Sequence, residues 1–192
     1  MDKHESLLQE AFASVKAWQS WLAKHYKTSN GLWLLIAKKN PAEPTVTYAE
    51  ALNVALCYGW IDGQKKPYDE QFWLQKFGPR KAKSLWSKKN IEHTERLIKE
   101  GKMKAAGLKA IEAAKANGNW QSAYDAQSKM TIPEDFLEAL HKNKKASRFY
   151  NTLNRTNLFS IYFRLQTAKK EETRQKRIQL IIDMLAREEK FH

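Results

Sequence analysis

Apolar residues that recur every three to four positions mark the first predicted element of the chain. A helix over residues 5–26 would turn one apolar stripe towards a core. This stripe consists of Leu8, Phe12, Val15, Trp18 and Leu22. The turn TSNG at residues 28–31 ends the helix. The continuous apolar run LWLLIAKK that follows, residues 32–39, is typical of a buried strand, since it is short and directly follows a glycine.

A second helix is predicted from its capping residues. Thr47 followed by Glu50 forms a capping box, in which each side chain accepts a hydrogen bond from the other residue's backbone N–H. Gly59 predicts the end of this helix, because glycine readily takes the left-handed conformation that closes many helices. The side of this helix predicted to be buried carries Ala51, Leu52, Ala55 and Leu56.

Two short strands are expected directly after that helix. The segments WIDGQKK, residues 60–66, and QFWLQKF, residues 71–77, flank the turn-like PYDE. This arrangement is typical of an antiparallel hairpin. Together with the strand at residues 32–39, the pattern predicts an α+β fold with a small sheet and early helices.

The next part of the chain is predicted to be helical. Pro79 ends the second hairpin strand, because proline cannot donate to a sheet ladder. One helix is expected over residues 84–101 and another over residues 103–118, each ending at a glycine. The inward positions expected for the first of these helices are Ile91, Leu97 and Ile98.

The C-terminal third has a different character. Residues 119–131 show no clear periodicity and are predicted to be a connecting segment. Helical patterns follow from Pro133 onwards, where two acidic residues occupy the expected first turn. We therefore expect an α+β core over residues 1–118 and a C-terminal helical region over residues 119–192, packed on the core as one domain.

Charge adds information about partners. The 192 residues include 34 Lys and Arg against 21 Asp and Glu, a net charge of +13, which favours nucleic acid, anionic lipid or small anions. Two stretches without acidic residues concentrate these cations, six of them in residues 71–91 and eight in residues 139–170. Aromatic residues lie among the cations in both stretches. We interpret the aromatic side chains as mostly core and the cations as a rim around them.

The single cysteine, Cys57, excludes an intramolecular disulfide and fits a reducing compartment. Cys57 lies among apolar helix positions with no His nearby in sequence, so burial is predicted rather than a nucleophilic role. The sequence shows no zinc-site spacing, phosphate-binding glycine loop or nucleophile elbow. It also shows no apolar stretch typical of export or membrane spanning. We expect a cytoplasmic protein, and we assign no catalytic residue, metal or cofactor.

The candidate binding residues surround the expected helix start at residue 84. Backbone N–H groups and the positive end of a helix favour an anion, and Arg80, Ser87 and Asn90 add directional donors. The plainer interpretation is that a serine only caps the helix and the lysines are solvated. Asp62 can orient an arginine or accept from a ligand, although a simple Asp-Gly turn also explains it. The candidate ligand-binding residues are Trp60, Asp62, Arg80, Lys83, Ser84, Trp86, Ser87 and Asn90.

Four blocks of the sequence match one known family in their order and spacing, along nearly the whole chain. They are ALCYGWIDG at residues 55–63, Pro79-Arg80 leading to Ser84, Trp86, Ser87 and Asn90, GKM at residues 101–103 with Gly107, and AKKEETR at residues 168–174. With these blocks the chain resembles the YdeI/OmpD-associated family, also called the OmdA or bacteriocin-protection family. Gly78 stands where that family usually has Thr. The resemblance implies a soluble bacterial protein linked to tolerance of bacteriocins or antimicrobial peptides, and it supplies no catalytic residues.

From these observations we expect a non-enzymatic binding protein with a basic anion-binding groove. One alternative is an enzyme for a small anionic substrate, with Asp62 as acid or base and Arg80 as the anion clamp. Another alternative is a non-specific nucleic-acid binder. The groove and the enzyme both require a concave pocket that unites Asp62, Arg80, Ser87 and Asn90.

Overall fold

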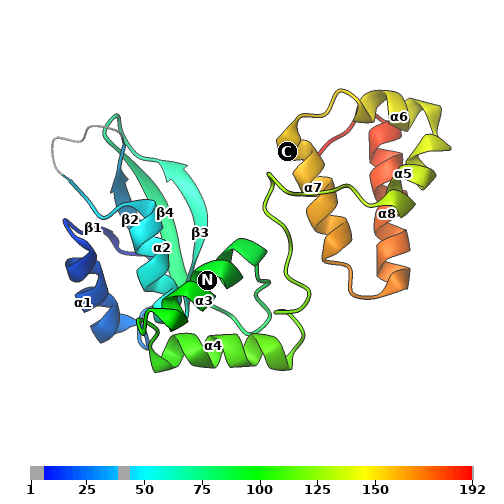
Figure 1. Cartoon of the computed structure of the whole chain (residues 1–192). Coiled ribbons are helices and arrows are strands. Elements are labelled where there is room, and N and C mark those ends of the chain that lie inside the picture. The colour runs from blue at the N-terminus through cyan, green and yellow to red at the C-terminus, as the bar shows by residue number, and fades with distance from the viewer. Residues whose placement is uncertain (1–6, 39–43, 192) are drawn as a thin grey trace, which may run out of the picture. The chain divides into compact units, whose positions relative to one another are not determined.

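The structure is a computed structural model that describes residues 7–38 and 44–191. The chain divides into two compact units: residues 1–86 with 90–121 form the first unit, and residues 87–89 with 122–192 form the second. Each unit has its own hydrophobic core. Helices and one four-stranded sheet confirm the predicted α+β class (Figure 1). The packing of the C-terminal region on the core as one domain stays a prediction.

The sheet of the first unit has the strand order β1-β2-β4-β3. Its strands are β1 (Gln9–Ala11), β2 (Leu32–Ala37), β3 (Trp60–Pro67) and β4 (Phe72–Pro79). The predicted hairpin is confirmed, because β3 and β4 pair in antiparallel fashion, and β4 then pairs antiparallel with β2. The strand predicted at residues 32–39 is also confirmed, although it ends at Ala37 and Lys39 lies outside the described residues.

The first predicted helix is wrong at its N-terminal end. Residues 9–11 form strand β1, which runs parallel to β2, and helix α1 covers only Val15–His25. Two local interactions explain this break. The carbonyl of Leu8 accepts a hydrogen bond from the backbone N–H of Trp33 at 2.8 Å, and the hydroxyl of Ser14 accepts one from the backbone N–H of Ala17 at 3.2 Å, capping α1. The predicted helix residues 5 and 6 lie outside the described range.

Helix α2 (Tyr48–Cys57) confirms the capping-box prediction. The backbone N–H of Thr47 donates to the Glu50 carboxylate at 2.9 Å, and the Glu50 N–H donates back to the Thr47 hydroxyl at 3.3 Å. Helix α2 packs against α1 and β3 (Figure 1). Trp18 of α1 is fully buried in this core, where its indole N–H donates to the carbonyl of Ala51 at 3.1 Å.

Helix α3 (Lys88–Lys99) begins four residues later than predicted. Residues 81–84 form a separate turn, because the hydroxyl of Ser84 accepts a hydrogen bond from the backbone N–H of Lys81 at 3.1 Å. Of the expected inward residues, Leu97 is buried, whereas Ile98 is 44% exposed and was therefore assigned wrongly. Helix α4 (Ala105–Ala116) confirms the prediction for residues 103–118.

The ends of α2 and α4 approach each other so closely that two glycines are required. A Cβ built on Gly107 would lie 2.7 Å from the carbonyl oxygen of Leu56 and closer still to that of Cys57. A Cβ on Gly59 would lie 2.8 Å from the carbonyl oxygen of Ala106, and Gly59 also has a φ of +73°, which favours glycine. These obstacles are backbone atoms, so no side-chain rotation can make room for a larger residue.

The substitution Gly107→Ala should therefore lower the free energy of unfolding by about 1–3 kcal/mol, the usual cost of overpacking a close contact. Urea denaturation followed by circular dichroism measures this loss. Gly63→Ala is the matched control, because a Cβ there would meet only the Lys76 side chain, at the ordinary contact distance of 3.7 Å. Equal stability of the two variants would show that α4 can move away from α2 without cost.

The second unit is a packet of helices around one core (Figure 1). Its main helices are α5 (Glu134–His141), α6 (Lys144–Tyr150), α7 (Arg155–Gln166) and α8 (Glu171–Ala186). The helical nature of this region is confirmed. The predicted connecting segment 119–131 is also confirmed, since it holds no helix or strand apart from an isolated bridge between Tyr124 and Ser87.

The AKKEETR block begins α8 and ties three helices together. Glu171 and Glu172 occupy the first turn of α8, where negative charge complements the helix dipole. Arg174 forms two hydrogen bonds to the carboxylate of Asp135 on α5, at 2.6 and 2.8 Å, and a third to the carbonyl of Leu165 on α7 at 3.0 Å. The hydrogen bonds from Arg174 hold the pKa of Asp135 below its ordinary value.

Asp135→Asn should lower the free energy of unfolding at pH 7 by about 1 kcal/mol, since the ion pair is partly exposed. The lowered pKa means that ionised Asp135 stabilises the fold above the ordinary Asp pKa of about 3.9. The stability difference from the parent protein should therefore shrink as the pH falls from about 5 through the lowered pKa. Thermal melts across this pH range provide the measurement. Glu138→Gln, which alters an exposed acid on the same helix, should show neither effect.

Candidate functional site

Four of the eight candidate residues line one cavity of the first unit. Trp60, Arg80, Ser84 and Trp86 belong to the wall of a cavity of about 330 Å³, which we call the Arg80 cavity. Residues of β3, the loop after β4 and helix α4 form this wall. The sequence therefore predicted part of a real concavity, but it gave no sign that α4 forms one side.

Arg80 is held in place by three contacts within the first unit. Its backbone N–H donates to the carbonyl of Gly59 at 3.0 Å, and its Nη1 donates to the carbonyl of Leu85 at 2.9 Å. Its guanidinium carbon lies 3.8 Å from the centre of a Trp86 ring, a cation–π contact. Trp86 is buried and packs in turn against Trp120, with ring centres 4.9 Å apart. These contacts fix the guanidinium as a rigid part of the wall.

The remaining wall is largely apolar. Trp60 is buried, and its indole N–H donates to the carbonyl of Tyr26 at 3.1 Å, so Trp60 supports the wall and exposes little of its ring. Helix α4 contributes a run of small side chains. These are Ala106, Ala110, Ala113 and Ala114. Their small size leaves the space that larger residues would fill.

The charge at the Arg80 cavity has one sign. Four cationic residues line it, and none of the described residues around it is Asp or Glu. The cations are Lys27, Arg80, Lys81 and Lys109. A concave, partly apolar wall that carries positive charge attracts anions and strengthens their contacts, because fewer water molecules screen the charge.

The other four candidates do not line this cavity. The carboxylate of Asp62 accepts a hydrogen bond from the Tyr48 hydroxyl at 2.8 Å, which gives it a structural partner. Lys83 is exposed on the loop, and Asn90 lies in the first turn of α3. The cavity therefore does not unite Asp62 with Arg80, the arrangement on which the enzyme alternative depended.

Ser87 and its neighbour Lys88 belong to the second unit, where they pair with the connecting segment. Ser87 forms the isolated bridge with Tyr124, and the Lys88 ammonium lies 2.8 Å from the Asp125 carboxylate. The Tyr162 hydroxyl donates to Asp125 at 3.0 Å and accepts a hydrogen bond from the backbone N–H of Asp125 at 2.9 Å. The hydrogen bond from Lys88 lowers the pKa of Asp125. The carboxylate of Asp125 therefore already neutralises Lys88, the residue next to the candidate Ser87.

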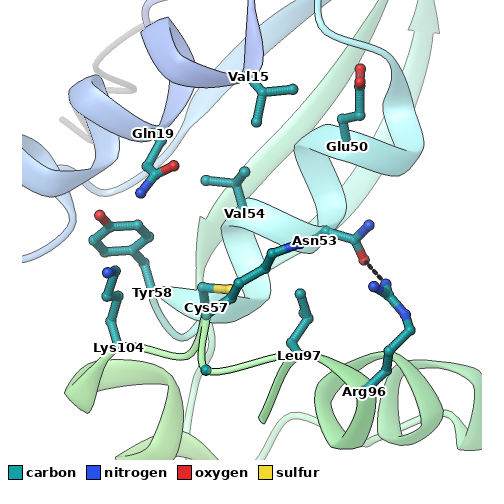
Figure 2. Close-up of a pocket in the computed structure, with 12 residues that line it drawn as sticks. Val15, Gln19, Glu50, Asn53, Val54, Cys57, Tyr58, Arg96, Leu97 and Lys104 are labelled. Atoms are coloured by element: carbon teal, nitrogen blue, oxygen red, sulfur yellow. Dashed lines mark hydrogen bonds between the residues drawn. The ribbon is translucent and has the colours of Figure 1, made fainter. Parts of the chain in front are cut away.

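Sequence reasoning missed a second cavity of the first unit, which we call the Cys57 cavity. It has a volume of about 370 Å³, and residues of α1, α2, α3 and the α3–α4 turn line it (Figure 2). Arg96 donates to the side-chain oxygen of Asn53 at 3.0 Å, as Figure 2 shows. Glu100 bonds both Arg96, at 2.9 Å, and Lys102, at 2.8 Å. Positive charge at this cavity is therefore partly neutralised.

Cys57 lines the Cys57 cavity but is only 6% exposed, which confirms its predicted burial. Burial raises the pKa of the thiol above its ordinary value, and the nearby cations Lys104, Lys102 and Arg96 offset part of this effect. A neutral, shielded thiol is a poor nucleophile. The surroundings of Cys57 thus support a packing role.

Cys57 should accordingly react slowly with a maleimide at pH 7 in the native protein and rapidly in urea. Cys57→Ala should lower the free energy of unfolding by about 1 kcal/mol, because the loss of the sulfur leaves a small void. Timed mass spectrometry gives the labelling rate, and urea denaturation gives the stability. Native labelling as fast as that of the unfolded chain would contradict burial.

The described residues offer neither a metal-binding cluster nor a membrane-spanning helix. No cluster of three or more His, Cys, Asp or Glu residues suited to a metal ion occurs within residues 7–38 and 44–191. In the same ranges, no helix is long and apolar enough to span a membrane.

Comparison with known families matches the two halves of the chain separately. Residues 10–110 match the family described as a domain of unknown function, DUF8412, and residues 129–188 match the OmdA family, described as Bacteriocin-protection, YdeI or OmpD-Associated. Because the first match covers more than half of the 192 residues, the chain belongs to the DUF8412 family. The OmdA match confirms the predicted YdeI/OmpD-associated resemblance over residues 129–188, which include the AKKEETR block, whereas the other three blocks lie within the DUF8412 match. Neither the curated proteins nor the solved structures gave a match.

Proposed function

We propose that the protein is a non-enzymatic binding protein that takes an anionic ligand in the Arg80 cavity. The observation that carries this proposal is the set of four cations around an otherwise mostly apolar cavity without an acidic residue among its described lining. The Arg80 cavity is better suited to an anion than the Cys57 cavity, because Glu100 neutralises cations beside the Cys57 cavity.

The wall chemistry indicates what kind of anion would fit. The alanines of α4 offer methyl surface, Trp60 and Trp86 are buried within the wall, and the cations lie around this apolar part. A ligand with a flat apolar body and one phosphate or carboxylate would use both parts of the wall. The exposed lysines of the lining, Lys27, Lys81 and Lys109, can approach the anionic group directly. Arg80 adds fixed positive charge to the wall, since its Nε and Nη2 are buried and its Nη1 donates to the Leu85 carbonyl.

Binding is favoured over catalysis by the residue types at the cavity. Within the described lining there is no Asp, Glu, His or Cys, the side chains that most often act as general base or nucleophile. The hydroxyl of Ser84 accepts a hydrogen bond from a backbone N–H and has no described imidazole beside it in the lining. The family description connects the C-terminal match with bacteriocin protection, and we extend that role to this chain as part of the proposal.

The cavity can be tested with phenyl phosphate as the probe, using calorimetry. Arg80→Lys should weaken binding by about 1–3 kcal/mol, because lysine cannot reproduce the Leu85 hydrogen bond and the stacking on Trp86 that together fix the positive charge in the wall. Lys81→Ala should weaken binding by about 0.2–1 kcal/mol, the range for an exposed charge. Inorganic phosphate should bind more weakly than phenyl phosphate, since it lacks a ring to contact the apolar wall.

Lys83→Ala is the matched control, because it removes the same charge from the same loop but does not line the cavity. It should leave the affinity for phenyl phosphate unchanged. If Lys81→Ala and Lys83→Ala weaken binding equally, the attraction comes from net charge and the cavity is not the site. Thermal melting of each variant separates lost binding from lost folding, which matters for Arg80 because of its bond to the Leu85 carbonyl.

A further inference from the structure

Several arginines of the second unit are committed to holding its fold. Arg174 binds the Asp135 carboxylate, and Arg155 donates to the carbonyls of Gln127 and Ser128 at 2.8 to 3.1 Å. Arg164 stacks on the ring of Phe191, with its guanidinium carbon 4.0 Å from the ring centre. These cations are not free to serve a partner without loss of internal contacts.

A different group of cations lines a groove between α6 and the end of α8. The groove has a volume of about 680 Å³, and its cations are Lys144, Lys145, Arg148 and Arg187. The first three are exposed, and no ion pair or side-chain hydrogen bond engages them within the described residues. Arg187 is paired with Glu189. These three cations therefore do not help to hold the fold, in contrast to Arg155, Arg164 and Arg174.

The spacing of these cations matches a polymeric ligand that carries several negative charges along its length. Lys144 and Arg148 are one helical turn apart on α6, about 6 Å along its axis. Phe149 lines the same groove and adds an aromatic surface. The volume is about twice that of the Arg80 cavity, at 680 against 330 Å³. Such a groove has room for more than one charged group of a ligand.

We propose that this groove binds the phosphodiester backbone of single-stranded nucleic acid, without sequence preference. Lysine and arginine side chains neutralise successive phosphates, and an aromatic ring can contact a base of any sequence. A concave wall is better matched to a flexible chain than to the flat surface of a membrane. This site lies in the second unit and does not depend on the Arg80 cavity.

The proposal is tested on the full chain by fluorescence anisotropy with a labelled twelve-nucleotide oligothymidylate at several salt concentrations. The double variant Lys144→Ala/Arg148→Ala should bind more weakly. Its log–log salt slope should be about 1.4 smaller in magnitude, because two phosphate contacts are lost from a single strand. The control variant Lys129→Ala/Lys170→Ala removes the same charge from exposed positions outside the groove. The control should keep the parental slope.

A gain-of-binding variant gives a second, independent readout. Glu188 is the one acidic residue in the described lining of the groove. Glu188→Gln should tighten oligothymidylate binding, because it removes a negative charge that repels phosphate. Glutamine is preferable to glycine here, because Glu188 has a φ of 60° and glycine would also relieve the backbone. Lys81→Ala should leave this binding unchanged, which keeps the test separate from that of the Arg80 cavity.

Three results would overturn the proposal. The first is an equal loss of slope in the groove and control variants, which would show general electrostatic attraction. The second is the absence of oligothymidylate binding at low salt. The third is binding to vesicles with anionic phospholipid that the groove variant abolishes, while oligothymidylate does not compete with it. Normal thermal melting of each variant confirms that the second unit is folded in every arm.

Discussion

The first unit depends on the close approach of α4 to the end of α2, which Gly59 and Gly107 make possible. The backbone N–H of Lys104, just before α4, donates to the carbonyl of Cys57 at 3.1 Å and fixes this approach. As a result, the short segment from Cys57 to Trp60 stands between two cavities. Tyr58 lines both of them, Cys57 lines one, and Trp60 lines the other. One backbone contact thus determines the shape of both candidate sites.

The two cavities share this segment but differ in charge, because only one of them has an acid that is bonded to its cations. Glu100, at the end of α3, is close enough to bond both Arg96 and Lys102. The loop after β4 carries Arg80 and Lys81 into the Arg80 cavity without any acid of that kind in the described lining. The charge at each cavity is therefore set by which side chains lie near one another. The net charge of +13 alone does not show that the two cavities differ.

The sequence predicted those elements that are stabilised by interactions between residues close together in the chain. The Thr47–Glu50 box, the hairpin and the glycine after α2 all act within a few residues, and all were found. Strand β1 was missed because its pairing partner lies more than twenty positions away, in β2. The partner of Lys88 was missed for the same reason, since Asp125 sits in a segment without periodicity. Four candidate residues, Arg80 among them, line one cavity because the loop after β4 and strand β3 are close in sequence, whereas the α4 side of the wall comes from residues distant in sequence and was not foreseen. Ligand binding by these residues stays a prediction.

In the second unit, some basic residues hold the fold and others are exposed to solvent. Arginine can bind several acceptors in one plane, and Arg155 and Arg174 use this property to join segments that are far apart in sequence. Lysine gives a single mobile charge and is easily left to solvent. Residues 139–170 therefore combine arginines that hold the fold, such as Arg155, with cations of α6 that make no ion pair or side-chain hydrogen bond within the described residues. These α6 cations, Lys144, Lys145 and Arg148, lie beside one groove, so a ligand can contact them without breaking a bond that holds the fold.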